Sequence, residues 1–397
     1  MRGAPLARSG WGCLLTGVVL IGAGRLLGLP ELFLVGAVLV ALVALCLASV
    51  LVSPARLVVE RSIHPTRAHV GTPARVQLAI VNSSGRRSPV VSIRDPVSGT
   101  PGAEVLLAPL ARGERATAAY LLPTSARGLI RVGPLAVVAN DPFGLSKVPR
   151  AGAEPVELTV LPHVDELAPL TDTTGVDPHG GLRPAHRLDR GGEEFHALRP
   201  YVVGDDLRRV HWPSTARTDE VMVRQDELPW QGRTTVVADL RASTTTAAML
   251  EAVISAAASV LDSAWRRRDL VRLLTTDGTD SGFGAGHAHS EAILEHLAVV
   301  RAGPDRSLAA LCGRLDEGRG GALVLVVGEA PVEDLTVFLS RRAGFRTATL
   351  VRFGAPLPGD APHPAGVRLV QVTPGTNFAT AWNRTMTPAP GRRVYAR

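Results

Sequence analysis

The sequence predicts a multidomain protein. An N-terminal transmembrane helical hairpin is followed by an antiparallel β-sandwich and then by a doubly wound α/β domain. Three observations lead to this prediction. Residues 1–53 are almost entirely apolar, residues 54–165 alternate between apolar and polar side chains in short runs, and residues 232–397 alternate between strand-like and helix-like stretches. Residues 166–231 are polar and poorly periodic, and we treat them as a separate segment.

The N-terminal region contains two apolar stretches, 11–29 and 32–53. The second has no charged residue and is long enough to cross a hydrocarbon core of about 30 Å. The first is apolar except for Arg25, whose long side chain can reach the membrane interface. The alternative for the first stretch is a signal peptide, and the alternative for the second is a buried core helix. The sequence Leu29-Pro30-Glu31 predicts a tight turn, and no small-residue cleavage site is convincing, so we favour a hairpin.

The distribution of arginines around the hairpin predicts its orientation. Both flanks are basic, whereas the connecting turn has only Arg25 nearby; the flanking residues are Arg2, Arg8, Arg56, Arg61 and Arg67. Positive flanks favour the cytoplasmic side of a membrane. We therefore expect a cell-membrane protein with two spanning helices, in contact with the lipid bilayer, whose other domains face the cytoplasm.

Composition excludes several other classes of protein. Hydrophobic residues make up 46% of the 397 residues, which is too many for a wholly disordered chain. Three cysteines cannot form a disulfide framework. The formal net charge is +7, but its basic part is almost all arginine, with Lys147 the one lysine. We attribute this bias to GC-rich coding, and we expect no nucleic-acid partner.

The β-rich region begins at residue 54. Val76, Leu78 and Ile80 alternate with polar or small residues, and the turn 82–85 follows them. Further strands are expected at 57–63, 90–94, 114–122, 129–138 and 156–161. We see no cluster of reactive residues in this region, so a binding or spacer module is the natural interpretation.

The C-terminal region predicts a mainly parallel sheet. Strands are expected at 235–240, 270–275, 322–327, 347–352 and 367–372, and helices at 245–268, 290–300, 307–315, 332–343 and 377–382. Thr244 or Thr245 is a plausible N-cap of the first helix. Such sheets bind ligands at the carboxyl ends of their strands, which directs attention to Asp239.

Within residues 166–231, carboxylates and guanidiniums alternate at short intervals. The residues that we single out are Glu194, Phe195, Arg199, Tyr201, Gly204, Asp205, Asp206, Arg208, Trp212 and Arg217. Because arginine forms planar pairs with carboxylates, this segment is expected to form an internal ion-pair network or to bind a partner. Catalysis by Glu194, Asp205, Asp206 or His211 is a third possibility, but no nucleophile or metal-ligand spacing accompanies them.

These residues resemble the signature of the DUF58 family. The matching runs are Gly192 to Phe195, Leu198 to Tyr201, Gly204 to Trp212, and Ala216-Arg217. The resemblance extends to the apolar hairpin, to the β-rich middle and to Asp141-Pro142-Phe143-Gly144-Leu145. It implies a von Willebrand factor A-like C-terminal domain and an association with MoxR-type AAA+ ATPases and with other membrane proteins. The implied role is that of an accessory protein in the assembly or activation of other proteins.

The von Willebrand factor A resemblance raises the question of a metal site. The usual site has D-x-S-x-S after the first strand, and its oxygens suit Mg²⁺. Here Asp239 and Ser243 fit, but Arg241 stands at the first serine, and a guanidinium repels a cation. Thr276-Asp277-Gly278 follows the second strand, which is the wrong place, and Glu329 follows the third. We expect no metal cofactor, although Mg²⁺ is possible, and we expect Arg241 to pair with Asp239.

Two weaker features complete the sequence. Arg266, Arg267 and Arg268 end the long predicted helix, where cations complement the helix dipole. The stretch 278–286 is expected to be a flexible loop, and the two histidines that follow it, His287 and His289, are a poor metal signal.

Taken together, these features predict a membrane-anchored, non-enzymatic interaction or adaptor protein that works with a MoxR-type AAA+ ATPase. The alternatives are an envelope-associated hydrolase that uses Glu194, Asp205 or Asp206, and a metal-dependent adhesion module.

Overall fold

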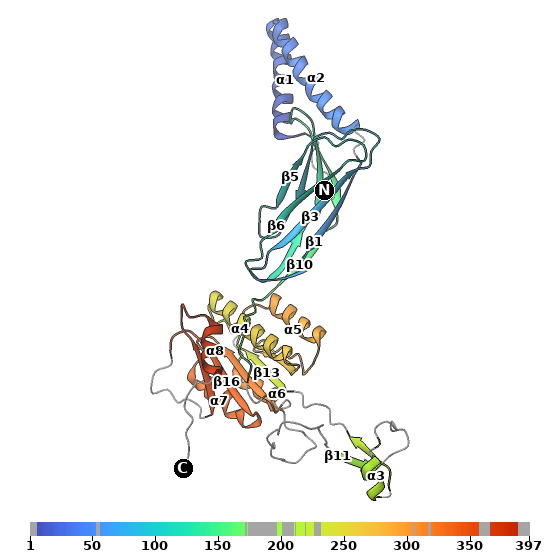
Figure 1. Cartoon of the computed structure of the whole chain (residues 1–397). Coiled ribbons are helices and arrows are strands. Elements are labelled where there is room, and N and C mark those ends of the chain that lie inside the picture. The colour runs from blue at the N-terminus through green and yellow to red at the C-terminus, as the bar shows by residue number, and fades with distance from the viewer. Residues whose placement is uncertain are drawn as a thin grey trace. The chain divides into compact units, whose positions relative to one another are not determined.

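A computed structural model describes most of the chain. The described residues are 6–52, 56–170, 173, 197–200, 210, 212–218, 220–225, 232–304, 306–316, 319–356 and 366–387. They form two compact units, residues 1–163 with 297–299 and residues 164–296 with 300–397 (Figure 1). Each unit is described by itself below.

Two apolar helices begin the first unit. Helix α1 (Arg8–Leu27) and helix α2 (Pro30–Val52) are both long and apolar enough to cross a membrane. Helix α1 is capped at its C-terminal end by Gly28, which adopts a left-handed conformation (φ 66°) and donates its N–H to the Gly24 carbonyl. The expected turn at 29–31 is therefore wrong in detail, because Pro30 and Glu31 already belong to α2. Proline is well suited to a first helical position, since it has no N–H to leave unpaired.

Glycines allow α1 and α2 to pack closely. A methyl group at Gly17 would lie 2.9 Å from Val40 Cγ2, and one at Gly36 would lie 2.6 Å from the Gly17 carbonyl oxygen. At Gly24 it would lie 2.5 Å from the backbone nitrogen of Phe33. Small residues at a helix interface permit the close van der Waals contact that drives packing in lipid.

The β-domain that follows contains three sheets. Strands β1 (Leu57–His64), β3 (Ala74–Asn82) and β6 (Arg115–Leu122) form one, and β5 (Ala103–Leu107), β4 (Val91–Asp95), β8 (Leu135–Asn140) and β9 (Lys147–Ala153) form another. The third contains β2 (Arg67–His69), β10 (Val156–Leu161) and β7 (Gly128–Val132). The expectation of purely antiparallel pairing is wrong for β2 and β10, which run parallel. The strand expected at 129–138 is two strands, since Gly133 and Pro134 interrupt it.

The core of the β-domain is apolar, and a buried ion pair lies beside it. Alternate residues of β3, including Val76, Leu78 and Ile80, point into it and are almost inaccessible. Beside them Arg61 Nη1 donates to Asp95 Oδ1 over 2.7 Å, and the Tyr120 hydroxyl donates to Asp95 Oδ2 over 2.7 Å. Burial and the neighbouring Asp95 carboxylate raise the pKa of Tyr120, so its hydroxyl stays protonated.

The second unit is built on a five-stranded sheet in which every described pair is parallel. Its strand order is β14 (Leu270–Thr275), β13 (Arg233–Ala238), β15 (Ala322–Val327), β16 (Thr347–Phe353) and β17 (Val367–Val372). This order is that of a doubly wound sheet. Strand β13, the first of these strands in the sequence, ends at Ala238, so that Asp239 and Leu240 lie in the following loop rather than in the strand.

Helices cover both faces of this sheet (Figure 1). The helical elements are α4 (Ala247–Arg266), α5 (His287–Val299), the 3₁₀ helix η2 (Leu308–Leu311), α6 (Cys312–Asp316), α7 (Val332–Leu339), the 3₁₀ helix η3 (Ser340–Gly344) and α8 (Phe378–Met386). Helix α4 is also apolar enough to span a membrane, but more than half of its most apolar window is buried within the unit. Its N-cap is Thr246, whose hydroxyl accepts from the Met249 N–H. The helices expected at 307–315 and 332–343 each divide into a 3₁₀ and an α segment.

The chain after β14 folds back along the outer edge of the sheet. Antiparallel bridges join Leu274 to Asp280 and Val271 to Gly284. The Arg272 guanidinium donates to both carboxylate oxygens of Asp280, at 2.9 and 2.5 Å. The expectation of a flexible loop at 278–286 is therefore wrong, because this segment pairs with β14 and covers an edge that would otherwise be exposed.

Candidate functional site

The candidate site lies where the central strands of the parallel sheet end. Strand β13 has β14 on one side and β15 on the other, and the chain leaves β13 and β15 toward helices α4 and α7. Asp239 directly follows β13, and its N–H donates to the Val326 carbonyl of β15 over 2.9 Å. In doubly wound sheets ligands bind at this point of the fold.

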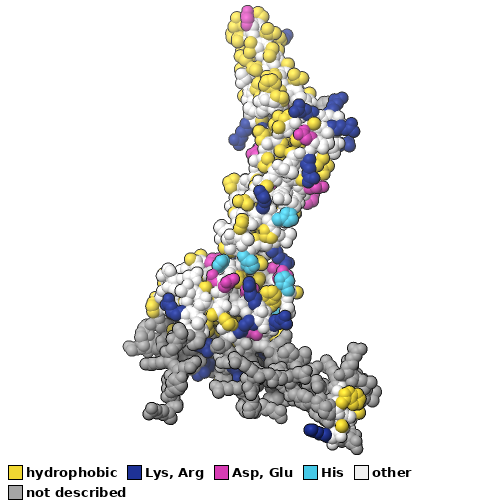
Figure 2. Space-filling view, in the orientation of Figure 1, with side chains coloured by type: hydrophobic (Ala, Val, Ile, Leu, Met, Phe, Trp, Pro, Cys, Tyr) yellow, Lys and Arg dark blue, Asp and Glu magenta, His cyan; other side chains and the backbone are white. Residues whose placement is uncertain are grey.

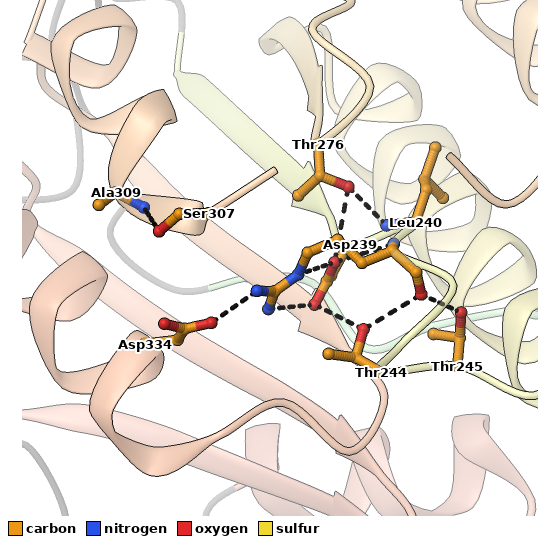
Figure 3. Close-up of polar contacts among 9 residues, drawn as sticks. Asp239, Leu240, Thr244, Thr245, Thr276, Ser307, Ala309 and Asp334 are labelled. Atoms are coloured by element: carbon orange, nitrogen blue, oxygen red, sulfur yellow. Dashed lines mark hydrogen bonds and ion pairs between the residues drawn. The ribbon is translucent and has the colours of Figure 1, made fainter. Parts of the chain in front are cut away.

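The guanidinium of Arg241 lies directly beside the Asp239 carboxylate. Arg241 Nε donates to Asp239 Oδ1 over 2.9 Å, and Arg241 Nη2 donates to Asp239 Oδ2 over 2.8 Å (Figure 3). Asp239 is fully buried and Arg241 is 5% exposed. This bidentate pair confirms the expected contact, and it places a positive charge directly against the carboxylate.

The same guanidinium also contacts a second acid. Arg241 Nη1 donates to Asp334 Oδ2 over 2.5 Å, and the Asp334 side chain is 30% exposed. Asp334 lies in the first turn of α7, where a negative charge is favoured by the helix dipole. Arg241 therefore joins the ends of β13 and α7, and the hydrogen bonds to Asp239 and Asp334 raise the pKa of Arg241.

Two threonine hydroxyls complete the surroundings of Asp239. Thr244 Oγ1 donates to Oδ2 over 3.1 Å, and Thr276 Oγ1 lies 3.5 Å from Oδ1 (Figure 3). The backbone N–H of Arg241 donates to Oδ1 over 3.1 Å. Both carboxylate oxygens are thus occupied by donors, whereas a metal ion requires free lone pairs.

The geometry does not fit a magnesium site. A guanidinium occupies the place beside Asp239, and Ser243 is exposed in the following turn while Thr244 contacts the carboxylate instead. Within the described residues, no group of three or more His, Cys, Asp and Glu side chains could hold a metal ion.

The sequence did not identify Thr276, Thr244 or Asp334 as members of this site. In the sequence Thr276 follows the second strand, where the usual metal-site pattern has no residue. Since β14 is the neighbour of β13 in the sheet, the residue after β14 reaches Asp239. The sequence offers no comparable indication for Asp334, except that an acid stands in the first turn after Pro331.

Residues 197–384 match the family described as "Protein of unknown function DUF58". The chain contains a DUF58 domain. The match covers the whole parallel sheet, so that Asp239, Arg241 and Asp334 all lie within the DUF58 domain.

Other comparisons add little to this assignment. No curated protein matches the chain. Among solved structures, the chain is similar to the CARDB domain of a Pyrococcus furiosus protein (17% identity, 27% of this chain and 89% of that chain, TM-score 0.22). It is also similar to a putative ApaA protein from Bordetella pertussis (16% identity, 28% and 97%, TM-score 0.19). These TM-scores are too low to indicate a shared fold.

The signature residues near the start of the DUF58 domain are described only in part. Arg199 lies in β11 (Ala197–Pro200), which pairs with β12 (Met222–Gln225). Trp212 and Arg217 lie in α3 (Trp212–Thr218) and are both exposed. The remaining signature residues lie outside the described residues: Glu194, Phe195, Tyr201, Gly204, Asp205, Asp206, Arg208 and His211.

Proposed function

We propose that this protein is a membrane-anchored, non-enzymatic adaptor that works with a MoxR-type AAA+ ATPase in the assembly or activation of other proteins. The observation that carries the proposal is the buried contact between Asp239 and Arg241. An aspartate whose oxygens already accept from a guanidinium and two hydroxyls is a poor general base and a poor metal ligand. The site at the end of the sheet is therefore suited to recognition rather than to catalysis.

The DUF58 domain is proposed to be von Willebrand factor A-like, with a fixed cation in place of the metal. The parallel doubly wound sheet, the acid after its first strand and the threonine hydroxyls around that acid support this comparison. In such a site Arg241 would supply the positive charge and Asp334, which is partly exposed, would face a partner. Recognition would then need no divalent ion.

Helices α1 and α2 are proposed to anchor the chain in the cell membrane with the DUF58 domain on the cytoplasmic side. Their length and hydropathy support spanning. Arg8, the first residue of α1, and Arg56, which follows α2, support the orientation. A cytoplasmic position is also the one in which an ATPase can reach the domain.

Co-purification from membranes tests the partner. The tagged full chain would be recovered from its own cells after expression of AAA+ ATPases that bind ATP but do not hydrolyse it, so that complexes persist. We expect a MoxR-type ATPase in the eluate, and a chain with Asp334→Arg should lose it, because that change reverses the exposed charge. Recovery of no ATPase from the trapped cells would refute the proposal.

The same preparation distinguishes adaptor from hydrolase. Chains with Glu194→Ala, Asp205→Ala and Asp206→Ala would be compared with the unaltered chain for partner recovery and for release of envelope material. The adaptor proposal predicts no hydrolytic product from any of these chains. A product that depends on these carboxylates would overturn it.

A further inference from the structure

The end of the β-domain nearest the hairpin is formed by loops that belong together. Strand β3 ends at Asn82 and β6 begins at Arg115, so the loops 83–90 and 108–114 lie at the same end of the domain. The Ser88 N–H donates to the Leu110 carbonyl, and the Gly113 N–H donates to the Asn82 carbonyl, both over 2.9 Å. These hydrogen bonds hold the two loops together, so that they form one continuous surface.

Two connections hold this end close to the membrane-spanning helices. Helix α2 ends at Val52, and Arg56, four residues later, accepts the Ser83 N–H at 2.9 Å. Four residues extend at most about 14 Å. The loop 141–146 also binds the start of α1, because the Ala7 N–H donates to the Leu145 carbonyl over 2.9 Å and the Ser9 hydroxyl donates to the Gly144 carbonyl over 2.8 Å.

This end carries an excess of exposed positive charge. Figure 2 shows dark blue side chains on the β-domain next to the yellow hairpin. The exposed arginines are Arg56, Arg86, Arg87, Arg112 and Arg115. None of them forms an ion pair in the described part of the chain, and Glu114 directs its carboxylate to the Ala111 N–H, 2.6 Å away.

Exposed aromatic rings accompany the arginines. Phe143, in the loop that binds the start of α1, is 66% exposed, and Trp11, in the first turn of α1, is 55% exposed. Aromatic side chains are enriched where a protein meets the headgroup layer of a bilayer. Basic and aromatic residues thus occur together at the position where the chain enters the membrane.

We propose that this surface, formed by Arg56 and the loops 83–90, 108–114 and 141–146, binds the headgroups of acidic phospholipids. The proposal rests on the membrane anchoring proposed above and adds a lipid class to it. Each guanidinium near an anionic bilayer surface contributes roughly a fivefold gain in binding, and arginine pairs with phosphate through two parallel hydrogen bonds. The surface would fix the β-domain against the bilayer rather than leaving it on a free tether.

Lipid titration of the full chain tests this proposal. The protein in a neutral detergent would be titrated with phosphatidylglycerol or phosphatidylcholine, and bound lipids counted by native mass spectrometry. The test variant carries Arg86→Gln, Arg87→Gln and Arg112→Gln. The matched control carries Arg75→Gln, Arg94→Gln and Arg131→Gln, which remove the same charge from exposed positions toward the other end of the strands.

We expect the unaltered chain and the control to prefer phosphatidylglycerol, and the test variant to lose that preference by on the order of a hundredfold. Raised salt should weaken the preference, since exposed charges are screened. Equal binding of both lipids by the unaltered chain, or an equal loss in the control, would overturn the proposal. Recovery of the ATPase is a separate measurement, so either proposal can fail alone.

Discussion

At the scale of single residues, Arg241 determines what the end of the sheet can do. Its guanidinium satisfies a fully buried carboxylate that otherwise has only hydroxyl and backbone donors. A buried charge without a counter-charge is strongly destabilising, so Asp239 and Arg241 can be expected to depend on each other. The site is built around a covalently attached cation, whose occupancy does not vary with metal concentration.

Removal of this cation should destabilise the DUF58 domain. We expect Arg241→Ala to lower the free energy of unfolding by about 3–5 kcal/mol, because it leaves Asp239 buried and unpaired. Urea denaturation followed by tryptophan fluorescence measures the change. Arg319→Ala is the control: its side chain is 62% exposed and pairs with Asp316, so the loss should stay below about 1 kcal/mol. Equal losses would contradict the role given to Arg241.

A second substitution tests whether the arginine stands in for a metal. Arg241→Ser removes the guanidinium and leaves the oxygens of Asp239, Thr244 and Thr276 facing the vacated space. We expect Mg²⁺ or Mn²⁺ to raise the melting temperature of this variant and not that of the unaltered chain. The additional change Asp239→Ala should abolish the effect. Saturable metal binding by the unaltered chain that Asp239→Ala removes would refute this view.

The contact between Asp239 and Arg241 could be predicted from the sequence because the two residues are two positions apart. The contacts of Asp239 with Thr276 and of Arg241 with Asp334 span 37 and 93 residues. They depend on strand order and on where α7 begins, and local periodicity contains neither. The signature segment differs from these contacts. Its pattern is easily recognised in the sequence, but most of its residues lie outside the described part of the chain.

At the scale of elements, the glycines of the hairpin lie on two different faces. Gly17 and Gly36 lie where α1 and α2 pack against each other, and Gly12 and Gly22 lie away from this contact. We expect Gly17→Leu and Gly36→Leu to force α1 and α2 apart, because even one methyl group there would lie within 3 Å of the partner helix. Gly12→Leu and Gly22→Leu are matched controls, since nothing lies within 4 Å of either position. Crosslinking yield between cysteines placed on the two helices measures the packing. A similar loss in all four variants would refute the assignment of faces.

The segment that covers β14 should respond to pH through Asp280. The Arg272 hydrogen bond lowers the pKa of Asp280, so this contact stabilises the fold above the ordinary aspartate pKa and is lost as pH falls through the lowered value. We therefore expect Asp280→Asn to reduce stability at neutral pH, and the difference from the unaltered chain to vanish in acid. Melting curves across that range provide the test, and a difference that persists at the acid end would contradict it.

Elements with strong periodicity could be predicted, and short ones could not. Helices α1 and α2 and the buried strands β14 and β15 follow directly from their apolar runs. Strands β2, β5 and β9 were missed because they are short or contain Pro149 and Gly152, which obscure alternation. Helix α4 begins later than expected, because Thr244 and Thr245 use their hydroxyls on Asp239 and on the Arg241 carbonyl instead of capping the helix.

At the scale of the whole molecule, the two units have separate apolar cores. One cluster lies within the β-domain around Val76, Leu78 and Ile80, and another lies between the parallel sheet and helices α6 and α7. The sequence predicts separate domains at residues 54–165 and 232–397, since each of these regions has its own period of apolar residues. Separate cores imply that the DUF58 unit can fold without the hairpin and the β-domain.

The stability of an isolated DUF58 fragment should depend on whether it includes residues 164–170. The Ala168 N–H donates to Asn383 Oδ1 over 2.6 Å, the Trp382 indole N–H donates to the Ala168 carbonyl over 2.8 Å, and Leu170 is buried. We expect residues 164–397 to unfold cooperatively on heating. A fragment of residues 171–397 should be less stable by about 3 kcal/mol or more, because it leaves the buried Trp382 indole without its acceptor and exposes the surface under Leu170. Equal melting temperatures for the two fragments would show that residues 164–170 are a linker and not part of the domain.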